Sequence, residues 1–80
     1  MKYLVVVPEK VQKELNKIPN LYRQKIIATL SVLANNPYCG KKLEGEHKGE
    51  RSLKVWPYRI IYRIKQRELL LLLIKDDSII

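Results

Sequence analysis

Basic side chains interrupt two neighbouring apolar runs, residues 51–55 and 58–64. In a β-strand, residues two apart share a face. Lys54 therefore lies on the opposite face from its apolar neighbours, and Arg59 shares a face with Arg63. Because only a Trp-Pro turn separates the runs, we predict a hairpin with one side on a core and a cationic surface on the other. Arginine and lysine on such a surface can bind phosphate groups.

Length and charge agree with a small domain that meets an anionic partner. The 80 residues are enough for one domain, 1–80, with a modest core, and the 46% hydrophobic content is too high for disorder. Sixteen Lys and Arg against eight Asp and Glu give a net charge of +8. We expect a polyanion or an acidic protein as partner. The alternative is a very soluble domain with no anionic partner.

Cysteine and histidine are too few for most metal or thiol chemistry. Cys39 is the only cysteine and His47 the only histidine. An internal disulfide is therefore impossible, a cytoplasmic setting fits, and we expect no metal site and no cofactor. A catalytic Cys39–His47 pair is the less favoured hypothesis, and His47 fits a solvated turn better.

No secretion signal or membrane segment is expected, and so no membrane partner. The longest apolar run, residues 69–74, is far shorter than the roughly 20 residues that a membrane helix needs. We predict a strand there that is buried on both faces, or nearly so.

The remaining pattern predicts an α+β fold. Residues 3–7 form a strand, a first helix ends at Pro19, and Asn20 caps a second helix that ends before Pro37. Residues 38–50 are rich in Gly and charge, which favours a solvated loop. The hairpin and the leucine strand follow. We predict an N-terminal strand, a two-helix hairpin, and a three-stranded antiparallel meander forming one small sheet.

Four short motifs resemble one protein family. Residues 58–64 look like the YRVIYRI signature of the RelE/ParE toxins of prokaryotic type II toxin–antitoxin systems. Residues 15–19 resemble the family's L-x-x-L/I-P helix break, residues 33–37 its L-x-x-N-P helix end, and residues 42–45 its K-L-x-G lead into the hairpin. The motifs occur in the family's order and spacing over about residues 1–75.

The resemblance implies a RelE-like fold and a ribosome-dependent mRNA endonuclease that works without a metal. RelE-type toxins cut mRNA in the decoding site by attack of a ribose 2′-hydroxyl on the adjacent phosphate. Arg59 matches the family's phosphate-holding arginine, and Lys54 matches a basic position that stabilises the oxyanion or assists proton transfer. The expected RNA-binding residues are Arg51, Ser52, Arg63 and Lys42. The expected partners are an acidic antitoxin, the ribosome and mRNA.

Two departures from the family pattern keep alternatives open. Ser52 stands where the family has a first basic residue, and residues 74–80 carry no Tyr, His or Arg of the family's catalytic tail. We therefore expect a weak or inactive nuclease. The alternatives are a ParE-like inhibitor of DNA gyrase, and a truncated, non-catalytic toxin that only binds its antitoxin. Arg59 could also form an ordinary surface ion pair with a loop glutamate, namely Glu44, Glu46 or Glu50.

Overall fold

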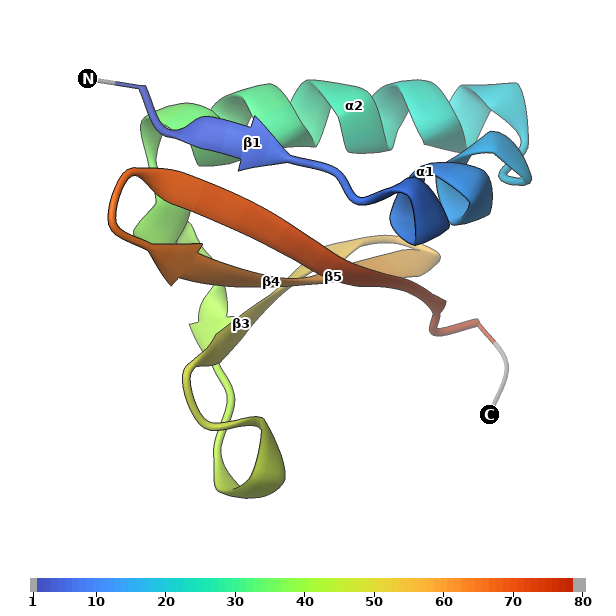
Figure 1. Ribbon diagram of the computed structural model, residues 1–80. Coiled ribbons are helices and arrows are strands. Elements are labelled where there is room, and N and C mark those ends of the chain that lie inside the picture. Colours follow the sequence, from blue (N-terminus) through green and yellow to red (C-terminus); the bar gives the residue numbers. More distant parts are fainter. Residues whose placement is uncertain (1, 79–80) are drawn as a thin grey trace.

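The computed structural model describes residues 2–78, which form a two-layer α+β domain with both helices on one side of a single sheet (Figure 1). The elements in chain order are β1 (Leu4–Val6), α1 (Glu9–Asn16), α2 (Asn20–Asn35), the short 3₁₀ helix η1 (Pro37–Cys39), β2 (Lys41–Lys42), a second 3₁₀ helix η2 (Gly45–His47), β3 (Glu50–Val55), β4 (Tyr58–Lys65) and β5 (Glu68–Asp76). The predicted fold class is confirmed.

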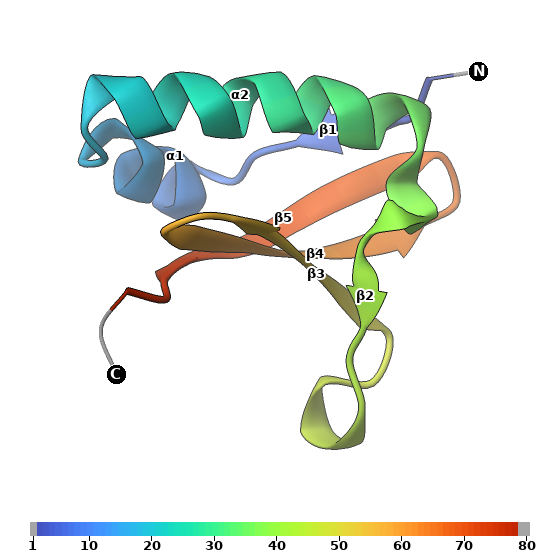
Figure 2. The same cartoon turned by 180° about the vertical axis from the view of Figure 1, so that it is seen from behind.

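The sheet contains more than the predicted meander. Its order is β1-β5-β4-β3-β2, and β1 pairs in parallel with β5, with Val5 opposite Leu69. The three strands β3, β4 and β5 pair antiparallel, as expected. The two-residue β2 adds an edge strand to β3 within the segment 38–50, which was predicted to be a loop throughout (Figure 2).

The two helices meet at Pro19 and cover the same face of the sheet. Helix α1 buries Val11 and Leu15, and α2 buries one stripe of apolar side chains. The predicted cap needs a correction, because α2 begins at Asn20 and the Asn20 side chain accepts a hydrogen bond from Arg23 rather than capping the helix. Within residues 2–78 no helix has the length and apolar character to cross a membrane.

The core lies between the helices and the sheet, and the hairpin alternates as predicted. Ile60 and Tyr62 on β4, and Leu69 and Leu71 on β5, have no exposed surface. Period-two alternation therefore directs the apolar side chains of β4 toward the helices and leaves its basic side chains on the open face.

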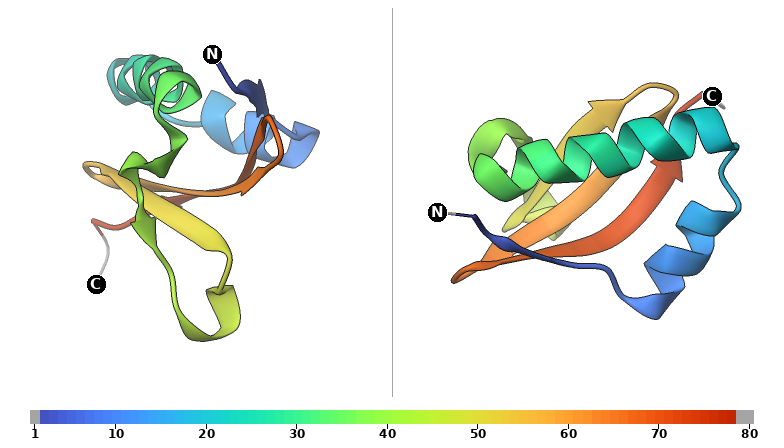
Figure 3. Two further views of the ribbon diagram at one scale, coloured as in Figure 1. Left: turned by 90° about the vertical axis from the view of Figure 1, so that its left-hand side faces the viewer. Right: turned by 90° about the horizontal axis from the view of Figure 1, so that it is seen from above.

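Residues 69–74 were predicted to form a strand buried on both faces, or nearly so, and this was wrong for the face away from the helices. Helices cover only one face of the sheet (Figure 3), and Leu70 and Leu72 are half-buried while Leu73 is 38% exposed. A register shift beside Ile61 and Tyr62 lets two successive leucines avoid the core. The run is uniformly apolar without being buried on both faces.

The segment after α2 is tied to the core by Tyr62. The Tyr62 hydroxyl donates to the carbonyl oxygen of Pro37 at 2.7 Å and accepts from the backbone N–H of Gly40 at 3.1 Å. Burial raises the pKa of Tyr62, so the hydroxyl stays protonated. A Cβ on residue 40 would lie 2.3 Å from the Tyr62 oxygen, which explains the glycine there.

Candidate functional site

Three cations form a row across the open face of the sheet. Lys54 on β3 lies opposite Arg59 on β4, and Arg59 lies opposite Lys75 on β5. Side chains of directly opposed residues project from the same face. Arg63, four residues beyond Arg59 on β4, lies on this face as well. The prediction that Lys54, Arg59 and Arg63 share one face is confirmed.

Arg59 is held at two points by neighbouring side chains. Its Nε donates to Oδ2 of Asp77 at 2.5 Å, and its Nη1 donates to Oγ of Ser52 at 2.8 Å. The alternative that Arg59 pairs with a glutamate of the 38–50 loop was wrong, because its acidic partner comes from just beyond β5. The Arg59 side chain is 32% exposed, so these two partners do not enclose it completely.

Asp77 is fixed in place by its backbone as well as by Arg59. Its N–H donates to the carbonyl oxygen of Pro57 at 2.8 Å, which fastens the end of β5 to the β3–β4 turn. The hydrogen bond from Arg59 lowers the pKa of Asp77, and the charges of Lys75 and Lys54 add to this effect. The carboxylate is therefore ionised at neutral pH. It accepts from a guanidinium N–H to which another anion would otherwise bind.

Ser52 orients Arg59 instead of facing solvent. It is 3% exposed, and its hydroxyl oxygen accepts the bond from Arg59. The residue that replaces a basic side chain in the family pattern thus contributes a neutral oxygen to the guanidinium. A hydroxyl at this position fixes the arginine without adding charge.

Arg63 belongs to a separate ion pair at the other end of the open face. Its Nη2 lies 3.3 Å from Oε2 of Glu50, and Nδ1 of His47 lies 3.2 Å from Oε1 of the same carboxylate. His47 is therefore engaged with Glu50, and Cys39 is exposed. Nothing in the geometry of residues 2–78 supports a Cys39–His47 catalytic pair.

Arg51 and Lys42 lie on the opposite side of the sheet from Arg59. Arg51 is opposed to the core residue Tyr62, and Lys42 is opposed to Arg51. Nη1 of Arg51 donates to the carbonyl oxygens of Tyr38 at 3.2 Å and Gly40 at 2.8 Å. The six residues predicted for the site therefore divide into two groups, one on each side of the sheet.

Sequence reasoning missed two members of the site, Lys75 of the cationic row and Asp77, the acidic partner of Arg59. Nothing local in the sequence links Asp77 to Arg59, because the pairing depends on the β4–β5 register. Lys75 is the one basic residue in the last strand, which is otherwise mostly leucine, so no alternating basic pattern marked it.

The open-face cluster can bind a phosphate group and polarise it. Lys54, Arg59 and Lys75 supply positive charge from three adjacent strands, and Ser52 fixes the guanidinium. Preorganised donors of this kind stabilise charge that develops on a phosphate oxygen. An incoming phosphate has to compete with the Asp77 carboxylate for Arg59.

The family comparison covers nearly the whole chain. Residues 5–78 match the family model described as ParE toxin of type II toxin-antitoxin system, parDE. Among curated proteins, no sequence is significantly similar to the chain.

Solved structures share the fold at low sequence identity. The toxin–antitoxin complex RelBE2 of Mycobacterium tuberculosis has a TM-score of 0.88 and 24% identity, covering 95% of this chain and 99% of that chain. The archaeal RelE–RelB complex of Pyrococcus horikoshii has a TM-score of 0.85 and 22% identity, with 100% of both chains covered. The chromosomal ParDE system of P. aeruginosa has a TM-score of 0.73 and 21% identity over 94% of this chain and 96% of that chain.

Proposed function

Because the chain belongs to the ParE toxin family of type II toxin–antitoxin systems, we propose that its cationic open face acts on RNA, as a RelE-like, ribosome-dependent mRNA endonuclease of low activity. The observation that carries this proposal is the register that aligns Lys54, Arg59 and Lys75 across three strands. The structural likeness to two RelE proteins in complex with their partners is consistent with it.

In this proposal, Arg59 holds the scissile phosphate and Lys54 stabilises the crowded oxyanion. Attack of the ribose 2′-hydroxyl places extra negative charge on the phosphate oxygens, and a guanidinium offers paired donors to two of them. Lys75 adds charge from the neighbouring strand. The ribosome would position the mRNA, which supplies the orientation that a small open surface lacks.

Low activity follows from the ion pair between Arg59 and Asp77. The carboxylate already occupies the guanidinium, so binding the phosphate requires breaking a short, charge-assisted hydrogen bond. The positioned acid–base groups that typically contribute about 10²–10⁴-fold are also not evident on the open face among residues 2–78. We therefore expect this protein to bind RNA more effectively than it cleaves it.

The test is primer extension on mRNA from programmed ribosomes. Wild type should give weak cleavage, and Arg59→Ala should lower both ribosome or RNA affinity and any cleavage. Lys13→Ala is a control that removes an exposed cation from α1, 71% of whose side chain is exposed, and it should behave as wild type. Strong wild-type cleavage that Arg59→Ala leaves unchanged would contradict the placement of the site.

We further propose an acidic, partly disordered antitoxin segment as the protein partner in the cytoplasm. The net charge of +8 and the exposed cations of the open face support it, and the relatives from M. tuberculosis and P. horikoshii were solved as toxin–antitoxin complexes. Such a segment would lie across the basic face and the helical hairpin. Co-purification from a host with the native operon should recover it, whereas full yield of the toxin alone without growth arrest would argue against it.

Inhibition of DNA gyrase is the second candidate, and the matching family model, which describes a ParE toxin, favours it. A supercoiling assay with purified gyrase separates the two functions, because only a ParE-like protein should block supercoiling in the absence of ribosomes. Failure of both assays, together with recovery of an antitoxin, would indicate a toxin that only binds its antitoxin.

A further inference from the structure

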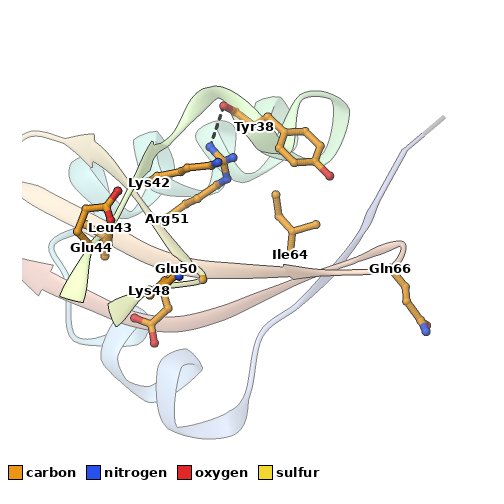
Figure 4. Close-up of a pocket in the computed structure, with 10 residues that line it drawn as sticks. Tyr38, Lys42, Leu43, Glu44, Lys48, Glu50, Arg51, Ile64 and Gln66 are labelled. Carbon is orange, nitrogen blue, oxygen red and sulfur yellow. Dashed lines mark hydrogen bonds between the residues drawn. The ribbon is translucent and has the colours of Figure 1, made fainter. Parts of the chain in front are cut away.

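A pocket on the side of the sheet away from Arg59 is built around Tyr38. Its volume is about 570 Å³, and it opens where η1, β2 and the start of β3 meet the far end of β4 (Figure 4). Side chains of five chemical kinds line it: the aromatic Tyr38, aliphatic groups that include Ile64, the amide Gln66, the cations Lys42, Lys48 and Arg51, and the carboxylates Glu44 and Glu50. None of the open-face cations Lys54, Arg59 and Lys75 reaches it.

The backbone that carries Tyr38 is held unusually firmly for a surface turn. The Tyr62 hydroxyl bonds to Pro37 and Gly40, on either side of Tyr38 along the chain. Arg51 donates to the carbonyl oxygens of Tyr38 and Gly40. Four hydrogen bonds thus fix a turn whose aromatic side chain is 58% exposed. A preorganised aromatic ring loses little conformational entropy when a ligand stacks on it.

The ring of Tyr38 is already used as a stacking surface by one cation. The guanidinium carbon of Arg51 lies 5.0 Å from the ring centroid, a cation–π contact that leaves the rest of the ring open. Ile64 supplies an apolar surface in the same cavity, and Gln66 supplies an amide that donates and accepts hydrogen bonds. A flat, polar-edged aromatic group such as a nucleobase matches these contacts.

The charge at the pocket favours an anion attached to that base. Three cations line the pocket against two carboxylates, Glu44 and Glu50. Glu50 is engaged by Arg63 and His47, which leaves Lys42 and Lys48 with one competing carboxylate. Lysines beside an aromatic platform are the combination with which proteins hold single-stranded nucleic acid.

A second aromatic–cation pair lies near the first. The guanidinium carbon of Arg67 is 5.9 Å from the ring centroid of Tyr3, and a hydrogen bond with Tyr38 raises the pKa of Tyr3. Arg67 directly follows the pocket residue Gln66 along the chain, so this second pair lies at the β4–β5 turn beside the pocket. A second base of the same strand could stack there.

We propose that the Tyr38 pocket binds a nucleotide of a single-stranded nucleic acid, with its base stacked on Tyr38 and its phosphate on Lys42 and Lys48. The inference rests on the proposed RNA-directed function for the identity of the strand, and it adds a site on the other side of the sheet from the cationic row. The pocket would hold a flanking nucleotide and leave the reacting phosphate to Arg59.

The experiment measures binding of a short fluorescein-labelled single-stranded RNA by anisotropy, with the DNA of the same sequence as a second arm. Tyr38→Ala should weaken RNA binding by about 5- to 100-fold, the range expected for loss of one base–aromatic stack. Tyr38→Phe keeps the ring and should bind as wild type. Trp56→Ala is the matched control, because Trp56 is another exposed aromatic residue, 65% exposed, on the distant β3–β4 turn. Circular dichroism melting shows whether each variant is folded.

The outcomes separate this proposal from the proposed function. Loss of affinity in a folded Tyr38→Ala, with cleavage still dependent on Arg59, supports both. Unchanged affinity in Tyr38→Ala, with Arg59→Ala impaired, overturns the pocket and leaves the endonuclease proposal standing. Equal binding of DNA supports the pocket but argues against an RNA-specific function. If neither strand binds, the nucleotide assignment is overturned.

Discussion

At the scale of single residues, the defining feature is the ion pair that Arg59 forms with Asp77. A carboxylate from Asp77 and a hydroxyl from Ser52 hold the guanidinium, while Lys54 and Lys75 stand on either side of it in the sheet. A phosphate and the Asp77 carboxylate compete for the same donors. The affinity of the open face is therefore set by the strength of this ion pair as well as by the number of cations.

Replacing Asp77 should strengthen anion binding. In Asp77→Asn the guanidinium keeps a neutral neighbour and loses the competing charge, so RNA affinity should rise by about 1.5- to 5-fold, the range of a partly exposed ion pair. Anisotropy with a short RNA measures this. Asp76→Asn is the matched control, because it removes the same charge one residue earlier from a carboxylate that accepts bonds from Ser78. Equal gains in both variants would point to general charge and not to the Arg59 contact.

The same ion pair should make stability depend on pH in the acidic range. The pKa of Asp77 is lowered in the folded chain, so its contribution is present above the unfolded pKa of about 4 and is lost as pH falls through the folded pKa. The melting temperature of wild type should drop more steeply below about pH 4 than that of Asp77→Asn. Parallel pH profiles for the two proteins would show that the pair contributes nothing to stability.

At the scale of elements, the turn after α2 links the core to the surface. Tyr62 projects from β4 into the core and ends in a hydroxyl that satisfies both Pro37 and Gly40. These two hydrogen bonds fix the position of η1 relative to β4. They therefore also fix the start of β2 beside β3 and the backbone that carries Tyr38. One buried hydroxyl thus transmits the packing of the sheet to the edge that carries the proposed nucleotide site.

Removing that hydroxyl should destabilise the fold without emptying the core. Tyr62→Phe leaves a buried carbonyl and a buried N–H without their partner, which costs about 1–3 kcal/mol of unfolding free energy. Urea denaturation measures the change. Tyr58→Phe is the control, since Tyr58 is only partly buried and packs by its ring edge against Tyr22. A loss in Tyr62→Phe no larger than in Tyr58→Phe would contradict the role of the hydroxyl.

At the scale of the whole molecule, the helices cover one face of the sheet and leave the other face open (Figure 3). The helices bury the apolar side of β4 and β5, while the open side combines the cationic row with half-buried leucines of β5. With a net charge of +8, the molecule should attract polyanions at a distance, and we expect them to bind where the cations converge. An acidic protein segment and RNA would therefore compete for overlapping surface.

Salt should reveal how many cations of the row meet phosphate. If Lys54, Arg59 and Lys75 each neutralise one phosphate of a single strand, they should contribute about −2 to the slope of the logarithm of affinity against the logarithm of salt concentration. Lys75→Gln should make the slope shallower by about 0.7. Anisotropy titrations at several salt concentrations give both values. An unchanged slope in Lys75→Gln would exclude this lysine from the phosphate contacts.

The sequence by itself determined both α-helices, the strands other than β2, and the face of each hairpin residue. Period-two alternation is a local property, so it correctly placed Arg59 on the open side and Ile60 and Tyr62 in the core. The short motifs were sufficient to identify the toxin family. Proline and the apolar stripes located both helices, although the expected cap at Asn20 was wrong.

Only the tertiary structure decided which side chains meet. Asp77 reaches Arg59 because β4 and β5 pair in a particular register, and Arg51 lies away from Arg59 because adjacent residues of β3 project to opposite faces. The leucine strand remained partly exposed because no second layer covers the open face. The composition of the strand gives no information about the layers that pack on it. Contacts between residues far apart in the chain depend on packing and register, and a single sequence encodes these only through the complete fold.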